Sequence, residues 1–261
     1  MEMTMTKDAT TKDMTTKDMT TQDTIRTILD LWKAVPRDGV DGLIKFLQES
    51  DFFSAPCSTQ FHLACPGGLA RHSLNVYQLL KEKVDRFAVC IPHESVIIAG
   101  LGHDLCKVNF YKEGGEPCTE AQHNYLSSLA NQYGWKCAPF KERFMPGGKL
   151  RKDIPAAQAS ILIDWLKNRS SQPMPPLPIS WSVDDKLPLG HGEKSLSILQ
   201  DFISLTEIEK LAIRWHMGPT EPGVHFGYPA GYAFRAAIEK HPFVTLLFCA
   251  DLEAAHVLEG G

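Results

Sequence analysis

The chain has 261 residues, of which 43% are apolar and 22% are charged, and its formal net charge is −4. This apolar share can build a packed core, which excludes a wholly disordered, collagen-like or fibrous protein. The mild acidity argues against a surface that binds duplex nucleic acid. Seven cysteines without a C-x-x-C pair are typical of reduced cytosolic thiols.

The chain also lacks the patterns of a membrane or secreted protein. Its longest apolar stretch, residues 243–250, is far shorter than the roughly 20 residues that a membrane span needs. No charged-then-apolar leader opens the sequence. We therefore expect a cytoplasmic protein without a membrane partner.

The N-terminal segment differs from the rest. Polar repeats of the form TKDMT run from Thr6 to Thr20. Without aromatic or leucine side chains they cannot bury enough surface to offset the entropy cost of ordering. We expect residues 1–23 to form a disordered tail and residues 24–261 to form the folded domain.

From Thr24 onward, apolar residues recur mostly at helical spacing, and no two segments alternate as paired strands would. The predicted fold class is therefore all-α. Residues 112–187, rich in glycine, proline and charge, form an insertion with one convincing helix. The predicted helices are 24–35, 40–49, 69–86, 92–107, 155–167, 193–203, 206–216, 230–239 and 242–258.

Four of these helices carry a histidine or an aspartate within or beside their apolar stripe. A buried carboxylate without a partner costs several kcal/mol, so it needs a cation or a metal ion. One such histidine is more often a satisfied core residue, but four converging helices are typical of a metal site inside a bundle. Imidazole and carboxylate together suit Mn, Fe, Zn or Mg. The residues are His72, His103 with Asp104, His216, and Asp251.

The order and context of these residues resemble a known family. His72 lies in GGLARHSLNVYQLL, His103-Asp104 in IIAGLGHDLCKVNFY, and Asp251 in LLFCADLEA. This pattern resembles the HD superfamily of metal-dependent phosphohydrolases over residues 55–111 and 187–258. The resemblance implies an HD-domain-like helical bundle.

Two more histidines are similar to those of the binuclear branch of that family: His191 in LPLGHGEKSL and His216 in IRWHMGP. The resemblance implies two divalent ions, drawn from Mn, Fe, Ni, Co and Mg. The first would be held by His72, His103, Asp104 and Asp251. Asp104 would bridge to the second, which His191 and His216 complete.

The activity that the resemblance implies is hydrolysis of a phosphomonoester or phosphodiester, of a nucleotide or a short oligonucleotide. A metal-bridging hydroxide would attack phosphorus, with Asp104 among the catalytic residues. Lys107 matches the lysine of the family's HD-x-x-K pattern. It would bind the substrate phosphate and neutralise charge that develops during the reaction.

Two further residues are candidates for substrate binding. His62, in QFHLACPGG, lies in text similar to the HD domain of certain bacterial 3′–5′ exoribonucleases, and Arg71 directly precedes His72. Gly227-Tyr228-Pro229 is similar to part of the HD-GYP signature of cyclic-di-GMP phosphodiesterases. The other residues of that signature are missing, so we interpret it as a turn.

Two alternative functions stay open at this point. A minority of HD-like proteins use the same ligand layout to hold two irons that activate oxygen on inositol or phosphonate substrates. A non-catalytic module that senses a nucleotide is the other alternative. Basic residues of the insertion, from Lys141 to Lys152, either contact phosphates or stay solvated.

Overall fold

The computed structural model describes residues 19–168, 173–221 and 229–260. Most of the predicted tail, and Gly227-Tyr228 of the GYP segment, lie outside these residues. The described chain consists of helices with one two-stranded sheet, which confirms the all-α prediction. Among the described residues, no helix combines the length and the apolar character that crossing a bilayer requires.

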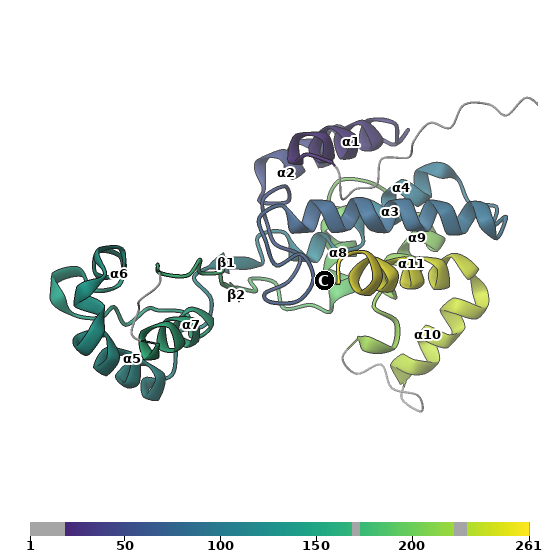
Figure 1. Ribbon diagram of the computed structural model, residues 1–261. Helices are drawn as coiled ribbons and strands as arrows, with labels where there is room; N and C mark the ends of the chain where they lie inside the picture. The colour runs from purple at the N-terminus through teal and green to yellow at the C-terminus, as the bar shows by residue number, and fades with distance from the viewer. Residues whose placement is uncertain (1–18, 169–172, 222–228, 261) are drawn as a thin grey trace, which may run out of the picture.

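Most helices pack into one main body around the long helix α3 (Figure 1). Helices α4 and α11 lie against α3, and α9 packs against both of them. The shared core contains Trp32, Leu47, Leu74, Ile98 and Phe243, none of which is exposed. The helices of this body are α1 (Thr21–Lys33), α2 (Val40–Glu49), α3 (Gly68–Arg86), α4 (His93–Gly102), α8 (His191–Gln200), α9 (Glu207–Arg214), α10 (Pro229–Lys240) and α11 (Pro242–Glu253).

A buried ion pair joins three of these elements. The Thr206 side chain and Glu209 form a capping box at the start of α9. Glu209 has no exposed surface, and Arg37 binds both of its carboxylate oxygens at 2.7 Å. The Ser95 hydroxyl at the start of α4 donates to the same carboxylate at 2.6 Å. Glu209 of the capping box thus fixes the α1–α2 loop and α4 relative to α9.

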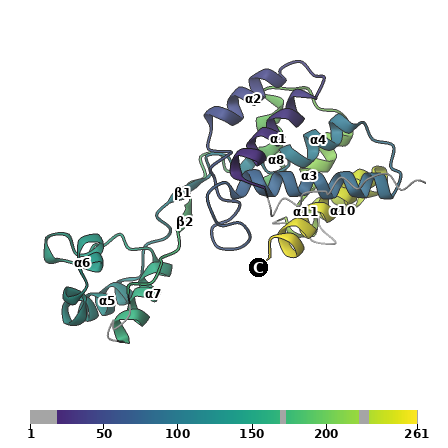
Figure 2. The same ribbon diagram turned by 45° about the horizontal axis from the view of Figure 1, so that its top comes forward.

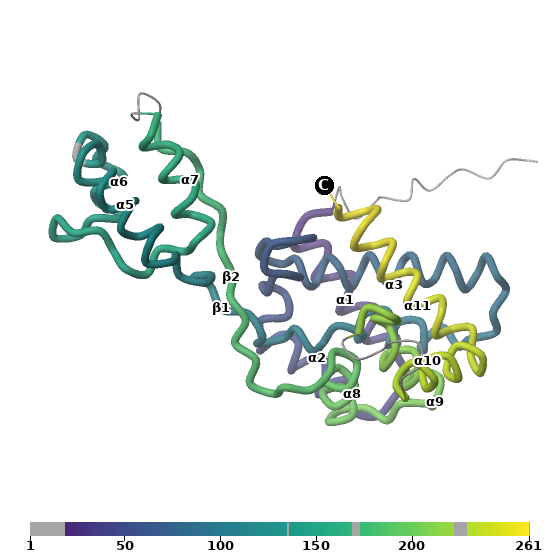
Figure 3. Tube along the Cα trace, turned by 90° about the horizontal axis from the view of Figure 1, so that it is seen from below, coloured from purple at the N-terminus to yellow at the C-terminus, as the bar shows by residue number. Residues whose placement is uncertain are grey.

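Residues of the predicted insertion form a smaller lobe, which Figures 1, 2 and 3 all show standing apart from the main body. Helices α5 (Glu120–Tyr133), α6 (Ala138–Phe144) and α7 (Ala156–Lys167) share a second core that includes Leu126, Phe140 and Leu162. Strands β1 (Tyr111–Glu113) and β2 (Trp181–Val183) pair antiparallel and lead into and out of the lobe. The prediction of no paired strands is therefore wrong, because three-residue strands are too short to show alternation.

Candidate metal centre

Four side chains predicted to hold one metal come together in the main body. His72 lies near the start of α3, His103 and Asp104 follow the last residue of α4, and Asp251 lies in α11. His72 Nε2 is 3.3 Å from His103 Nε2 and 3.0 Å from an oxygen of Asp251. Both Nε2 atoms are 3.6 Å from Asp104 Oδ2. The predicted residues thus form one buried cluster.

The prediction of a helix through Lys107 is wrong, and this changes how His103 and Asp104 are placed. Helix α4 ends at Gly102, His103 caps it, and Asp104 leaves helical geometry with φ −108° and ψ 20°. Residues Leu105–Lys107 form a separate 3₁₀ turn. The break lets both adjacent side chains face the cluster, which an unbroken helix would separate by about 100°.

The predicted helix 206–216 also ends early. Helix α9 stops at Arg214, so His216 lies in the turn that follows. His191 is the first residue of α8, two residues before the predicted start. Both histidines therefore extend from helix ends rather than from apolar stripes.

Hydrogen bonds at Nδ1 orient three histidines of the cluster. His103 Nδ1 donates to the carbonyl of Gly100 at 2.9 Å, and His216 Nδ1 donates to the carbonyl of Ile213 at 2.7 Å. His72 Nδ1 donates to Glu259 at 2.9 Å. Since a carbonyl can only accept, the proton stays on Nδ1 and Nε2 is left to bind another group. This second hydrogen bond is typical of histidines that ligate metals.

The Nε2 atoms are suitable for a cation. Burial lowers the pKa of His103 to about 4, so its Nε2 carries a lone pair at neutral pH. His216 Nε2 is buried and has no hydrogen-bond partner among the described residues; the nearest Asp104 oxygen is 3.6 Å away. Two nitrogens each about 2.1 Å from one ion lie roughly 3.0–3.4 Å apart, which matches the 3.3 Å between His72 and His103. The donor set fits a divalent metal.

The second predicted set also lies beside Asp104, with His216 Nε2 3.6 Å from Asp104 Oδ1. His191 and Asp104 place ligand atoms within 4.8 Å of each other, together with Cys106. The rings of His191 and His216 are 6.4 Å apart. Burial raises the pKa of Cys106 far above its usual value, so its thiol stays protonated and is a poor ligand. Asp104, His191 and His216 remain as the donors of this set.

Lys107 contacts Asp104 directly. Its ammonium lies 2.6 Å from Asp104 Oδ2. The sequence instead predicts that Lys107 contacts the substrate phosphate and none of the metal ligands. Burial opposes ionisation of Asp104, but Lys107 and His103 hold its pKa well below its usual value. Lys107 therefore compensates the charge of a candidate ligand and also lines the cavity above it.

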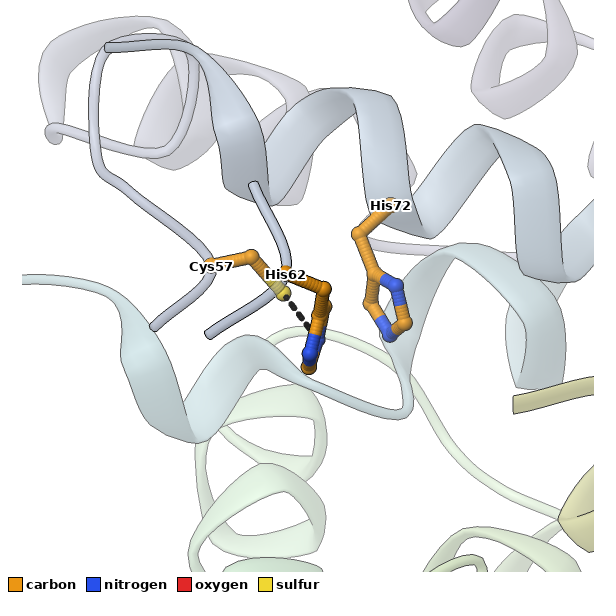
Figure 4. A group of neighbouring side chains, drawn as sticks. All are labelled: Cys57, His62 and His72. Atoms are coloured by element: carbon orange, nitrogen blue, oxygen red, sulfur yellow. Dashed lines mark hydrogen bonds between the residues drawn. The ribbon is translucent and has the colours of Figure 1, made fainter. Parts of the chain in front are cut away.

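His62 lies beside the cluster in a second group of donors, shown in Figure 4. Its Nε2 is 3.2 Å from Cys57 Sγ, and its ring is 5.0 Å from that of His72. Burial opposes ionisation of Cys57, but His72 and Lys107 lower its pKa to about 7. Cys57, His62 and His72 thus form another group that could hold a metal. Sequence analysis did not predict Cys57 as part of a site.

Glu259 is a further residue that the sequence did not indicate. Its carboxylate accepts hydrogen bonds from His72 Nδ1 and, at 2.6 Å, from the Asn75 amide. It follows a π-helical turn, Ala254–Leu258, that continues α11. This wider turn is often found at functional sites.

A cavity of about 680 Å³ opens above the cluster. His62 lines its wall, whereas Arg71 is half-buried and is not among the described residues that line it. The structure therefore does not bring Arg71 to the cavity. The charged and ligating residues of its floor are Asp104, Lys107, His191, His216, Asp251 and Glu259.

Comparison of the chain with protein-family models, with curated proteins and with solved structures found no match.

Proposed function

We propose that this protein is a metal-dependent phosphohydrolase of the HD type. The observation that carries the proposal is the convergence of histidine Nε2 atoms on Asp104, which is buried, and Asp251, which is half-buried, beside a cavity that both aspartates line. The order and context of the same residues resemble the HD superfamily, which supports the proposal independently of the geometry.

The residues divide into two ligand sets. The first ion would be held by His72, His103, Asp104 and Asp251, and the second by Asp104, His191 and His216. Divalent cations at these positions would supply Lewis-acid activation of the phosphoryl oxygens and of an attacking water. Mn, Fe, Co, Ni and Mg all accept imidazole and carboxylate ligands.

The charges of the cavity floor favour an anionic substrate once cations are bound. Asp104, Asp251 and Glu259 alone would repel a phosphate, and Lys107 is the one lysine or arginine among the described residues that line the cavity. Two divalent ions reverse this balance and leave an excess of positive charge. Lys107, which is buried beside Asp104, then stabilises charge on the phosphate.

We assign the substrate to nucleotides or short oligonucleotides, either as phosphomonoesters or as phosphodiesters. The cavity volume lies within the range of about 300–1,000 Å³ that is usual for small-molecule sites.

The cysteines of the described chain are all unpaired, which fits a protein of the reducing cytoplasm.

A hydrolysis screen under argon tests this function. Protein stripped of metal and reloaded separately with Mn, Fe, Co, Ni or Mg would be assayed on mono- and dinucleotides and on generic phosphate esters. We expect hydrolysis that needs the metal and is lost in His103→Ala. His123→Ala, in α5 of the small lobe, is the matched control and keeps full activity.

Other results would contradict the proposal. Turnover that requires oxygen and iron would favour an HD-like di-iron oxygenase. A nucleotide that binds tightly but stays intact with every metal would favour a sensing module.

A further inference from the structure

One aromatic side chain at the cavity is unusually exposed. Phe61 lines the cavity, and yet 75% of its surface is accessible to solvent. Single exposed hydrophobic side chains are common on protein surfaces, so what distinguishes Phe61 is that it lines the cavity. Phe61 directly precedes His62, which lies next to the metal-ligand candidate His72.

The loop that carries Phe61 is held in place at both ends. Its base is closed by a hydrogen bond from the Cys57 amide to the carbonyl of Leu63 at 3.0 Å. Within it, the buried Ser58 hydroxyl accepts from the Phe61 amide at 2.9 Å and donates to the carbonyl of His62 at 2.8 Å. The ring is therefore displayed by a fixed backbone.

The start of α3 packs tightly against the same loop. A Cβ atom on Gly68 would lie 2.1 Å from the carbonyl oxygen of Leu63, so only glycine allows this approach. Leu63 itself adopts a left-handed backbone with φ 45°, which is strained for leucine. This strain is maintained by the surrounding contacts and is common at binding sites.

The cavity is apolar away from its floor. Phe248, Leu252 and Ala255 of α11 and its π-helical extension contribute to the lining, and Leu252 is 43% exposed. The floor, in contrast, contains the metal-ligand candidates and Lys107. A ligand that fills the cavity must therefore combine an anionic group with a flat or apolar one.

We propose that Phe61 is the stacking platform for the base of a nucleotide whose phosphate lies at the metal-binding floor. This inference rests on the proposed function and specifies its substrate class. Every nucleobase offers a π-face, so stacking selects for a base without selecting its identity. Gln60 and His256, which also line the cavity, are exposed and can donate to or accept from the base edges.

Calorimetry with a matched pair of ligands tests the platform. AMP and ribose 5-phosphate carry the same phosphate, and only AMP has a base. Both would be titrated at 4 °C, with hydrolysis monitored in parallel, into Mn²⁺-loaded wild type, Phe61→Ala and Phe61→Tyr. The control is Phe87→Ala, because Phe87 is also a 60% exposed phenylalanine but does not line the cavity.

The proposal predicts that AMP binds wild type more tightly than ribose 5-phosphate does. Phe61→Ala should weaken the affinity for AMP about 5- to 100-fold and leave the affinity for ribose 5-phosphate unchanged. Phe61→Tyr keeps an aromatic face and should restore most of the affinity, and Phe87→Ala should match wild type.

Two outcomes would overturn the platform while the proposed function stands: equal affinity of both ligands for wild type, or equal weakening of both by Phe61→Ala. If neither phosphate binds the Mn²⁺-loaded protein, the proposed function fails and the platform fails with it. A Phe61→Ala protein that changes only in self-association would assign Phe61 to a protein contact and also reject the platform.

Discussion

His72 Nδ1 lies 2.9 Å from the carboxylate of Glu259, although 187 residues separate the two in the sequence. This hydrogen bond fixes the ring of His72 so that Nε2 faces Asp251 and His103. Such outer partners orient ligating histidines and increase their basicity. Glu259 is therefore a positioning residue for the candidate metal centre.

We expect Glu259→Ala to weaken Mn²⁺ binding roughly 10- to 100-fold, because His72 then loses the acceptor that orients it. Glu259→Gln retains an acceptor oxygen and should weaken binding less. Titration calorimetry measures both affinities. Glu253→Gln is the control, since Glu253 lies in the same C-terminal region and pairs, among the described residues, with Lys83 of α3 rather than with a histidine of the cluster. Equal affinities for all of these proteins would remove Glu259 from the centre.

Metal binding should release a proton from His72. Burial opposes its protonation, but Cys57 and the hydrogen bond with Asp251 outweigh burial and hold its pKa well above 6.5. The metal-free ring therefore holds its second proton more strongly than a free imidazole does, and a metal at Nε2 must displace that proton. Because the folded-state pKa is raised, competition by the proton grows as pH falls below that pKa.

The affinity for Mn²⁺ should consequently decrease as the pH is lowered, by up to about tenfold for each pH unit and each proton released. Calorimetry at one pH in buffers of different ionisation enthalpy counts the released protons. An affinity that is constant between pH 6 and pH 8, with no proton release, would contradict this account.

The two-metal assignment predicts different metal contents for different variants. His191→Ala and His216→Ala should lower the content from about two ions per chain to about one, because these residues serve only the second ion. Asp104→Asn should reduce binding of both, because Asp104 contributes to each set. Elemental analysis after dialysis gives these numbers. Full metal content and full activity in both histidine variants would show that the centre is not binuclear.

Lys107→Met separates phosphate binding from metal binding. The ammonium of Lys107 lies 2.6 Å from Asp104, and removing it also removes a charge that repels a metal ion. Metal affinity should therefore be kept or increased. Turnover of phosphate esters should fall roughly 100-fold, since one charge-stabilising contact is lost in a buried site. Unchanged turnover with full metal content would exclude Lys107 from catalysis.

Much of the main body was predictable because most of its helices bury one face, and that face leaves a 3.6-residue pattern. The stripes around His72 and Asp251 indicated that both side chains point inward, and the structure brings them to 3.0 Å. The end of α4 has no such signal, because Gly102 is its last helical residue and serves close packing: a Cβ atom there would lie 3.0 Å from a methyl carbon of Leu199.

Other features leave little trace in the sequence. Helices α5 and α6 of the small lobe are short or polar, so glycine, proline and charged neighbours mask their pattern. Glu259 meets His72 only through the tertiary fold, and a single glutamate near a helix end normally suggests a solvated residue. Lys107 and Asp104 are three residues apart, a spacing at which side chains also meet on an unbroken helix, so the sequence allowed their ion pair but did not require it.

The most direct test of the metal centre is an anomalous difference map from crystals grown with Mn²⁺, recorded near the manganese edge. The account predicts a strong peak bounded by His72, His103, Asp104 and Asp251, with a second peak beside His191 and His216. Density at Cys57 and His62 instead would assign the metal to the neighbouring group of donors. A map without a peak among the four predicted ligands would contradict the central claim.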